Sequence, residues 1–265
     1  MNPPLKLPIS VCIIASNEAH RIGATLKSVQ SWTSEIVVVI NDNGTDGTDK
    51  VVESFGGKVF REPWKGFLNQ KNSAADKCTQ PWLLNLDADE VVTPELQQEI
   101  IAVVGQNSPR HAAYEFPRCA FYCGRWIRHG DWYPDRVLRL WRREAARWGG
   151  IEPHTKLEVQ GRIGRLRSDL LHFTNENITR QISKITFNHV AFVQRRRASG
   201  KSVGFFELAV RPPWRFLRAY FLRLGFLDGW QGFYIAKVSA FSTLTRYVMV
   251  REAEQERTPP PTAPQ

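Results

Sequence analysis

Two carboxylates stand one residue apart directly after an apolar run in the first third of the chain. Asp87 and Asp89 follow Pro81–Leu86, whose pattern is typical of a strand buried on both faces. Two such anions repel each other unless a cation lies between them. Mg²⁺ and Mn²⁺ prefer carboxylate oxygen and commonly keep substrate phosphates as further ligands. The spacing alone is common by chance, but its position at a strand end makes both residues candidate metal ligands.

Polar side chains also follow two earlier apolar runs, Ile9–Ser16 and Glu35–Ile40. These polar residues are Asn17, Glu18, Asp42 and Asp46. In a parallel sheet, ligands bind outside the carboxyl ends of the strands. We therefore expect these residues to converge with the acidic pair at one edge of the sheet.

Strands and helices alternate in the pattern of the first 105 residues. The predicted strands are 9–16, 35–40, 58–61 and 81–86, with helices within 17–30, through Val51 and over 69–77. Another helix is predicted after Thr93, which suits an N-cap, with Pro94 at the first helical position. This alternation predicts an α/β fold, a parallel sheet with helices on both faces.

The pattern changes after residue 112. Strands are predicted at Ala113–Phe121 and Arg136–Trp141, and a hairpin within 157–172. Beyond Asn175 the chain is expected to be helical, basic and aromatic. We therefore divide it into a sheet domain (1–175), a helical extension (176–257) and a disordered Pro-rich tail (258–265).

The glycine loops that cradle phosphates are missing. Neither G-x-x-x-x-G-K-[ST] nor G-x-G-x-x-G follows the first strand, which argues against a P-loop NTPase and a nicotinamide enzyme. A nucleotide diphosphate would be held by metal and basic side chains. Arg139, Arg142 and Arg143 are candidates, with a solvated strand edge as the alternative. His172 is either a third metal ligand or a hydrogen-bonded core histidine.

Positive charge is concentrated toward the C-terminus. The net charge of +10 divides into −3 over residues 1–110, +6 over 111–194 and +7 over 195–265. Such a basic half suggests an anionic partner: nucleic acid, acidic lipid or a phosphorylated substrate; a solvated surface is the alternative. The four cysteines, read as reduced thiols, fit a cytoplasmic chain. Neither a secretory signal nor a membrane-spanning helix is predicted.

Arginines alternate with large aromatic residues between Arg211 and Arg223. A helix of this composition can lie at a membrane interface, with its rings among the headgroups and its arginines on lipid phosphates. The alternative is a core-packing helix with an exposed basic side. Nucleic-acid binding is disfavoured because no known module fits. We expect peripheral contact with the anionic inner face of the cytoplasmic membrane.

Several motifs together resemble a known family. Asn41–Thr48 (NDNGTDGT) resembles the DDGSTDGT signature of family 2 inverting glycosyltransferases. Val11–Glu18 resembles that family's first strand and N-E loop, and Asp87–Glu90 its metal-binding D-x-D. Five further segments resemble the branch that adds glucose to the lipopolysaccharide inner core. These segments are Gly66–Ala74, Trp132–Asp135, Arg139–Arg143, Leu171–His172 and Phe226–Trp230.

The resemblance implies a GT-A-like fold, with a mixed, mostly parallel sheet, and a metal-dependent reaction. Asp42 would contact the uracil or ribose of a UDP-sugar, and Lys71 would lie near the nucleotide. Asp87 and Asp89 would bind ribose and the Mg²⁺ or Mn²⁺ that bridges the diphosphate. Glucose from UDP-glucose would pass to a lipopolysaccharide core sugar. The alternatives are another acceptor, either an exopolysaccharide lipid carrier or a protein, or a non-catalytic nucleotide-sugar-binding module.

Inversion would need one general base that takes a proton from the acceptor hydroxyl. Asp135 and Asp131 are candidates, in an aromatic, arginine-rich segment. Asp135 could equally be a structural acid that pairs with Arg136 or Arg139. Many members of this branch have His-Glu where this chain has His154 and Thr155, so the remaining candidates are Glu152 and His154.

Overall fold

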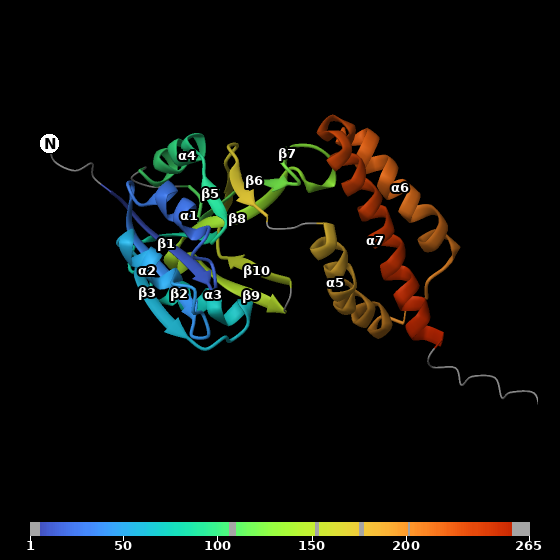
Figure 1. Ribbon diagram of the computed structural model, residues 1–265, viewed down its shortest axis with the longest axis horizontal. Coiled ribbons are helices and arrows are strands. Elements are labelled where there is room, and N and C mark those ends of the chain that lie inside the picture. Colours follow the sequence, from blue (N-terminus) through green and yellow to red (C-terminus); the bar gives the residue numbers. More distant parts are fainter. Residues whose placement is uncertain (1–5, 106–109, 152–153, 175–177, 201, 256–265) are drawn as a thin grey trace, which may run out of the picture. The chain divides into compact units, whose positions relative to one another are not determined.

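The computed structural model describes residues 6–105, 110–151, 154–174, 178–200 and 202–255. These residues form two units (Figure 1). The sheet unit comprises residues 1–119 and 135–173, and the helical unit comprises 120–134 and 174–265. Residues 120–134 thus group with the helices, although they lie within the first domain expected from sequence. Glu152 and the tail 258–265 fall outside the described residues.

The sheet unit is built on a mixed sheet whose first four strands are parallel. The strand order is β3-β2-β1-β4-β8-β6-β12-β5. The parallel strands are β1 (Leu7–Ala15), β2 (Thr33–Asn41), β3 (Lys58–Glu62) and β4 (Trp82–Asp87). The antiparallel pairs join β8 (Asp135–Arg142) to β4 and to β6 (Ala113–Tyr122), and β12 (Leu170–Phe173) to β5 (Glu90–Val92). The predicted parallel core is therefore confirmed.

Helices cover both faces of this sheet, as expected. The helices are α1 (Ile22–Val29), α2 (Thr48–Ser54), α3 (Phe67–Asp76) and α4 (Pro94–Val104). On one face, Ile13 packs in a core with Leu26 of α1 and Leu96 of α4. On the other, Cys12 packs with Ala74 of α3. Successive residues of β1 therefore serve opposite cores, because side chains alternate along a strand.

The N-terminus of α4 has the predicted cap. Thr93 Oγ1 accepts a hydrogen bond from the amide of Leu96 at 3.1 Å, and Pro94 occupies the first helical position. The predicted hairpin within 157–172 is wrong. β10 (His154–Val159) instead pairs with β9 (Ala146–Ile151), while β11 (Ile163–Arg165) and β12 join the main sheet. Short alternating segments indicate strands but not their partners.

A buried carboxylate near the start of β2 forms hydrogen bonds with residues of β1 and β3. Glu35 accepts hydrogen bonds from Ser10 Oγ, from Lys58 Nζ at 2.8 Å and from the amide of Thr79 at 2.7 Å. Burial raises the pKa of Glu35, but these three partners outweigh it and lower that pKa to about 2. The ionised form is therefore favoured by folding.

Replacing Glu35 with glutamine is expected to cost about 2 kcal/mol of unfolding free energy at pH 7. Because the folded pKa lies below the ordinary value, this stabilisation is present above about pH 4.5 and is lost as the pH falls toward 2. Urea unfolding of both proteins at pH 7 and pH 3 measures the difference. An equal difference at the two pH values would contradict the assignment.

The helical unit is formed by α5 (Ile178–Ala198), α6 (Arg211–Leu217) and α7 (Gly229–Gln255). A π-helical stretch precedes α6 and another follows it (Phe206–Val210 and Arg218–Leu222). α7 contacts both α5 and α6 (Figure 1). No helix in the described ranges is both long and apolar enough to cross a bilayer.

A buried acid holds residues 120–134 to these helices. Asp228 Oδ2 accepts hydrogen bonds from the amides of Arg128 at 3.0 Å and His129 at 2.8 Å. The amide of Gly130 donates to the carbonyl of Arg223 at 2.8 Å. These contacts join the segment containing β7 (Arg125–Ile127) to the helical unit, across about a hundred residues of sequence.

Candidate active site

The loops after β1 and β2 are joined by side-chain hydrogen bonds. Asn17 Oδ1 accepts from the amide of Thr45 at 3.0 Å, and the amide of Glu18 donates to Thr48 Oγ1 at 2.9 Å. Asp46 accepts from the amide of Ala19 and from that of Thr48. Asn17 and Asp46 thus use their oxygens to shape these loops. Asp42 is exposed at the end of β2.

Asp87 ends β4 between two cations. Its Oδ1 accepts from Lys71 Nζ at 3.2 Å, and its Oδ2 from Arg139 Nη2 at 2.5 Å. Burial raises the pKa of Asp87, yet Arg139 and Lys71 together hold it well below its usual range. Arg139 comes from the antiparallel neighbour β8 and also donates to Asn85 Oδ1 at 2.8 Å. Asp87 is therefore a fixed anion, each of whose oxygens accepts a hydrogen bond from a cation.

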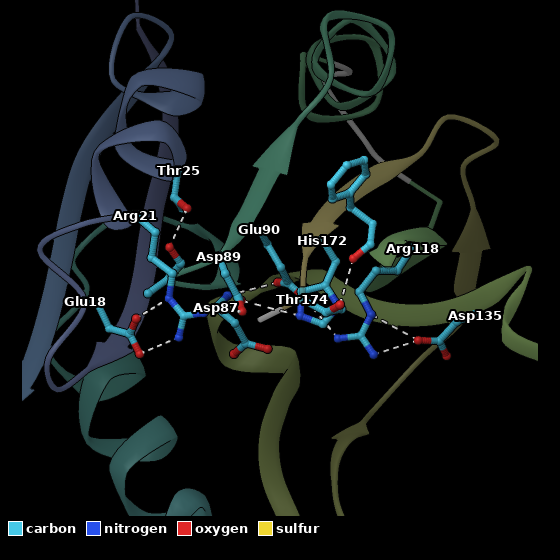
Figure 2. Close-up of polar contacts among 12 residues, drawn as sticks. Glu18, Arg21, Thr25, Asp87, Asp89, Glu90, Arg118, Asp135, His172 and Thr174 are labelled. Carbon is cyan, nitrogen blue, oxygen red and sulfur yellow. Dashed lines mark hydrogen bonds and ion pairs between the residues drawn. The ribbon is translucent and has the colours of Figure 1, made fainter. Parts of the chain in front are cut away.

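Asp89 lies beside a histidine and an arginine (Figure 2). His172 Nε2 is 3.5 Å from Asp89 Oδ1, and Arg21 Nη1 is 3.3 Å from Oδ2. The antiparallel pairing of β12 with β5 brings His172 to this position. Arg21 also forms an ion pair with Glu18, so the N-E loop reaches Asp89 through it.

Glu90 is a buried hub that the sequence pattern did not identify. Its side chain is 0% exposed. Oε1 accepts from Arg118 Nη1 at 3.0 Å and from Arg139 Nη2 at 2.9 Å, while Oε2 accepts from the amide of Asp87 at 2.9 Å. Glu90 directly follows Asp89 in the sequence, and this position could have identified it as a site residue. Arg21 and Arg118 were also missed, because no motif marks them.

Asp135 pairs with Arg118, and not with Arg136 or Arg139 as the structural alternative supposed. Arg118 donates to Asp135 Oδ2 from Nε at 3.0 Å and from Nη2 at 2.7 Å. The Asp135 side chain is 46% exposed, so it remains open to an incoming group. A chain of ion pairs then runs from Asp135 through Arg118, Glu90 and Arg139 to Asp87. Figure 2 draws four of these five residues, Asp135, Arg118, Glu90 and Asp87.

Comparison with known proteins places this arrangement in a family. The model of Glycosyl transferase family 2 matches residues 10–170, which contain both loops and the acidic pair. The chain belongs to glycosyltransferase family 2. This glycosyltransferase is 31% identical over 242 residues to LpsC of Rhizobium meliloti strain 1021, a lipopolysaccharide core biosynthesis glycosyltransferase, covering 89% of this chain and 88% of LpsC. It is 30% identical over 254 residues to an uncharacterized glycosyltransferase of Rickettsia typhi, covering 92% and 87%.

The fold of the glycosyltransferase is also found among solved structures. S. aureus TarS (residues 1–349, in complex with UDP-GlcNAc) superposes with a TM-score of 0.50 and 15% identity, covering 96% of this chain and 92% of that one. At this identity the likeness concerns the fold alone. The GT-A-like architecture expected from the sequence motifs is thereby confirmed.

Four further predicted site residues of the glycosyltransferase are Arg142, Asp131, Glu152 and His154. Arg142 pairs with Trp82 at the start of β4, at the opposite edge of the sheet, so the prediction that it holds the nucleotide is wrong. The Asp131 side chain is 2% exposed and ion-paired with arginines of the helical unit, so, contrary to expectation, it is not open to an acceptor hydroxyl. Glu152 is outside the described residues. His154 is described by its backbone alone, which pairs with Ile151.

Proposed function

We propose that this glycosyltransferase transfers a hexose from a nucleotide sugar onto a sugar of the lipopolysaccharide inner core. The observation that carries this proposal is the 31% identity to LpsC across about nine-tenths of both chains. A match of that extent includes the helical unit as well as the family domain. The proposed donor is UDP-glucose, and TarS, which has the same fold, was crystallised with another UDP-sugar. The proposed stereochemical course is inversion, as the family 2 motifs imply.

The proposed nucleotide site lies at the carboxyl ends of β1, β2 and β4. Asp42 is exposed there and free of the loop contacts that engage Asn17 and Asp46. Lys71 is held by Asp87; burial lowers its pKa, although Asp87 opposes that effect. In this proposal Asp42 contacts the nucleoside, while Lys71 and Arg139 offset the charge of the diphosphate.

The residues present fit a divalent cation that is completed by substrate. Among the described residues, no three His, Cys, Asp or Glu side chains lie close enough to hold a metal by themselves. Asp89 and His172 supply an oxygen and a nitrogen 3.5 Å apart, so the diphosphate would contribute further ligands. We therefore propose Asp89 and His172 as ligands of Mg²⁺ or Mn²⁺, with Asp87 as an orienting anion. The ion would act as a Lewis acid toward the leaving diphosphate.

Asp135 is the proposed general base, with Glu152 and His154 as alternatives. A base must be deprotonated and within reach of the acceptor hydroxyl. Arg118 contacts the Asp135 carboxylate through Oδ2, and this side chain is 46% exposed, so an acceptor hydroxyl can reach it. Arg118 is itself anchored by Glu90, so the base and the donor site share one support.

The helical unit is proposed to contact the anionic membrane that carries the acceptor. It contains sixteen Lys and Arg against seven Asp and Glu, which is +9 of the net +10. Of twenty-two large hydrophobic side chains exposed in the described part of the chain, eighteen belong to this unit, including Phe205, Trp214 and Leu222. Cations beside exposed rings suit a lipid headgroup layer. Nucleic acid is not a proposed partner.

A donor screen tests the proposal. With UDP-glucose at a hundred times its dissociation constant and Mn²⁺ present, we expect the melting temperature to rise by about 5 °C. UDP-galactose and GDP-mannose serve as matched donors, and EDTA should abolish the shift. Transfer to isolated core oligosaccharide is then measured. Tight donor binding without turnover would favour a binding module, and turnover only on another acceptor would exclude the core assignment.

A further inference from the structure

Three arginines of the helical unit surround a single carboxylate. Arg215 Nε and Arg218 Nη2 each lie 2.6 Å from Asp131 oxygens, and Arg223 Nη1 lies at 3.4 Å. Arg215 belongs to α6, and the other two belong to the π-helical stretch after it and its C-terminal cap. The Asp131 side chain is 2% exposed, whereas the arginine side chains are 34–47% exposed. The acid is thus buried, while the three arginine side chains that contact it are each partly exposed.

The charges in this cluster do not balance. Three guanidinium groups carry fifteen N–H donors, and one carboxylate offers about four acceptor sites. Two other described acids of the helical unit have partners of their own, since Asp228 pairs with His129 and Glu207 lies 3.5 Å from Arg196. Burial lowers the pKa of Arg215, and Arg218, Arg246 and Arg223 lower it further against the opposing effect of Asp131. The cluster therefore has an excess of about two positive charges and many free donors.

Phosphate monoesters match this excess in both charge and shape. A phosphate monoester carries between one and two negative charges near pH 7 and three strong acceptor oxygens, and arginine binds such oxygens in pairs. Exposed Trp214, Leu217 and Phe221 lie on the same helical segments. An anion with an apolar tail would therefore find complementary groups for both of its parts.

We propose that Arg215, Arg218 and Arg223, held in place by Asp131, form a phosphate-binding site that takes the phosphate monoester of an anionic amphiphile. This inference deepens the proposed membrane contact, and rests on it for the lipid source of the ligand. It assigns a binding site to residues outside the transfer site of the sheet unit. It also assigns Asp131 the role of orienting these arginines.

Vesicle binding by the full-length protein, without donor or metal, tests this site. Phosphatidylcholine vesicles are doped with phosphatidic acid, a monoester, or with phosphatidylglycerol, a diester, to the same zeta potential. We expect about tenfold tighter binding to phosphatidic acid, and competition by inorganic phosphate beyond that of NaCl at equal ionic strength. Arg218→Gln should abolish the preference. Arg218→Lys keeps the charge but loses the planar fork, so it should still bind vesicles and also lose the preference.

Arg251→Gln, which removes an exposed arginine of α7, is the matched control and should retain the preference. Circular dichroism and thermal melting confirm that each variant folds. Equal binding to both vesicle types, unaffected by phosphate, would overturn the site while leaving the membrane contact standing. Thermal stabilisation of wild type by phosphate, absent in Arg218→Gln and without vesicle binding, would support a site for free phosphate groups and overturn the membrane source.

Discussion

Replacing Asp89 with asparagine is expected to lower the rate of sugar transfer at least about a thousandfold. Asp89 is the carboxylate beside His172, and in the proposed mechanism it holds the cation that offsets charge on the leaving diphosphate. Asparagine keeps the size of the side chain and removes its charge. Initial rates with saturating donor and Mn²⁺, together with calorimetric titration of Mn²⁺ in the presence of UDP, measure the effect.

Asp76→Asn is the matched control for this change. Asp76 is an exposed acid of the same unit, paired with Arg147 on the surface, so its loss should leave the transfer rate within about twofold of wild type. Both variants should melt within a few degrees of the parent. An Asp89→Asn protein that retains wild-type transfer and Mn²⁺ affinity would remove the metal site from the mechanism.

Replacing Glu90 with alanine is expected to destabilise the sheet unit by about 3–5 kcal/mol. Glu90 is fully buried and is the shared partner of Arg118 and Arg139. Without it, two guanidinium groups lose a buried counter-charge and the amide of Asp87 loses its acceptor. Urea unfolding at pH 7 measures the loss, and the slope of the transition shows whether the unfolded state is unchanged.

Two further variants distinguish this effect from a general loss of acid. Glu144→Ala removes a carboxylate whose side chain is 87% exposed, and it should change stability by less than about 1 kcal/mol. Glu90→Gln keeps an acceptor for the amide of Asp87. Its loss of unfolding free energy should therefore lie between those of Glu144→Ala and Glu90→Ala. If Glu90→Ala unfolds at the same urea concentration as wild type, Glu90 is not the support described here.

Local sequence patterns were sufficient to predict the parallel strands of the sheet unit and the N-terminus of α4. Nearly continuous apolar runs predicted β1, β2 and β4 because strands buried on both faces have no polar face to interrupt them. The cap at Thr93 was equally local, since it depends on four consecutive residues. The hairpin at 157–172 failed because strand pairing depends on distant partners: β11 joins β6, and β12 joins β5.

The candidate site also contains some residues that the sequence could predict and others that only the structure could place. The D-x-D spacing and its place at a strand end predicted Asp87 and Asp89, and the family resemblance implied Lys71. Lys71 Nζ lies 3.2 Å from Asp87 Oδ1. Arg139 and Arg142 could not be told apart by sequence. Only the antiparallel register of β8 against β4 puts Arg139 beside Asp87 and sends Arg142 to the far edge.

By itself, the sequence determined the parallel core, the acidic pair at its edge and the membership in glycosyltransferase family 2, because short-range periodicity and contiguous motifs encode all three. Tertiary structure alone decided which cation faces which acid. It selected Arg118 as the partner of Asp135, made Glu90 the common support and enclosed Asp131 among three arginines. Ion pairs form over a few ångströms of space between residues far apart in the chain, and no local pattern specifies that distance.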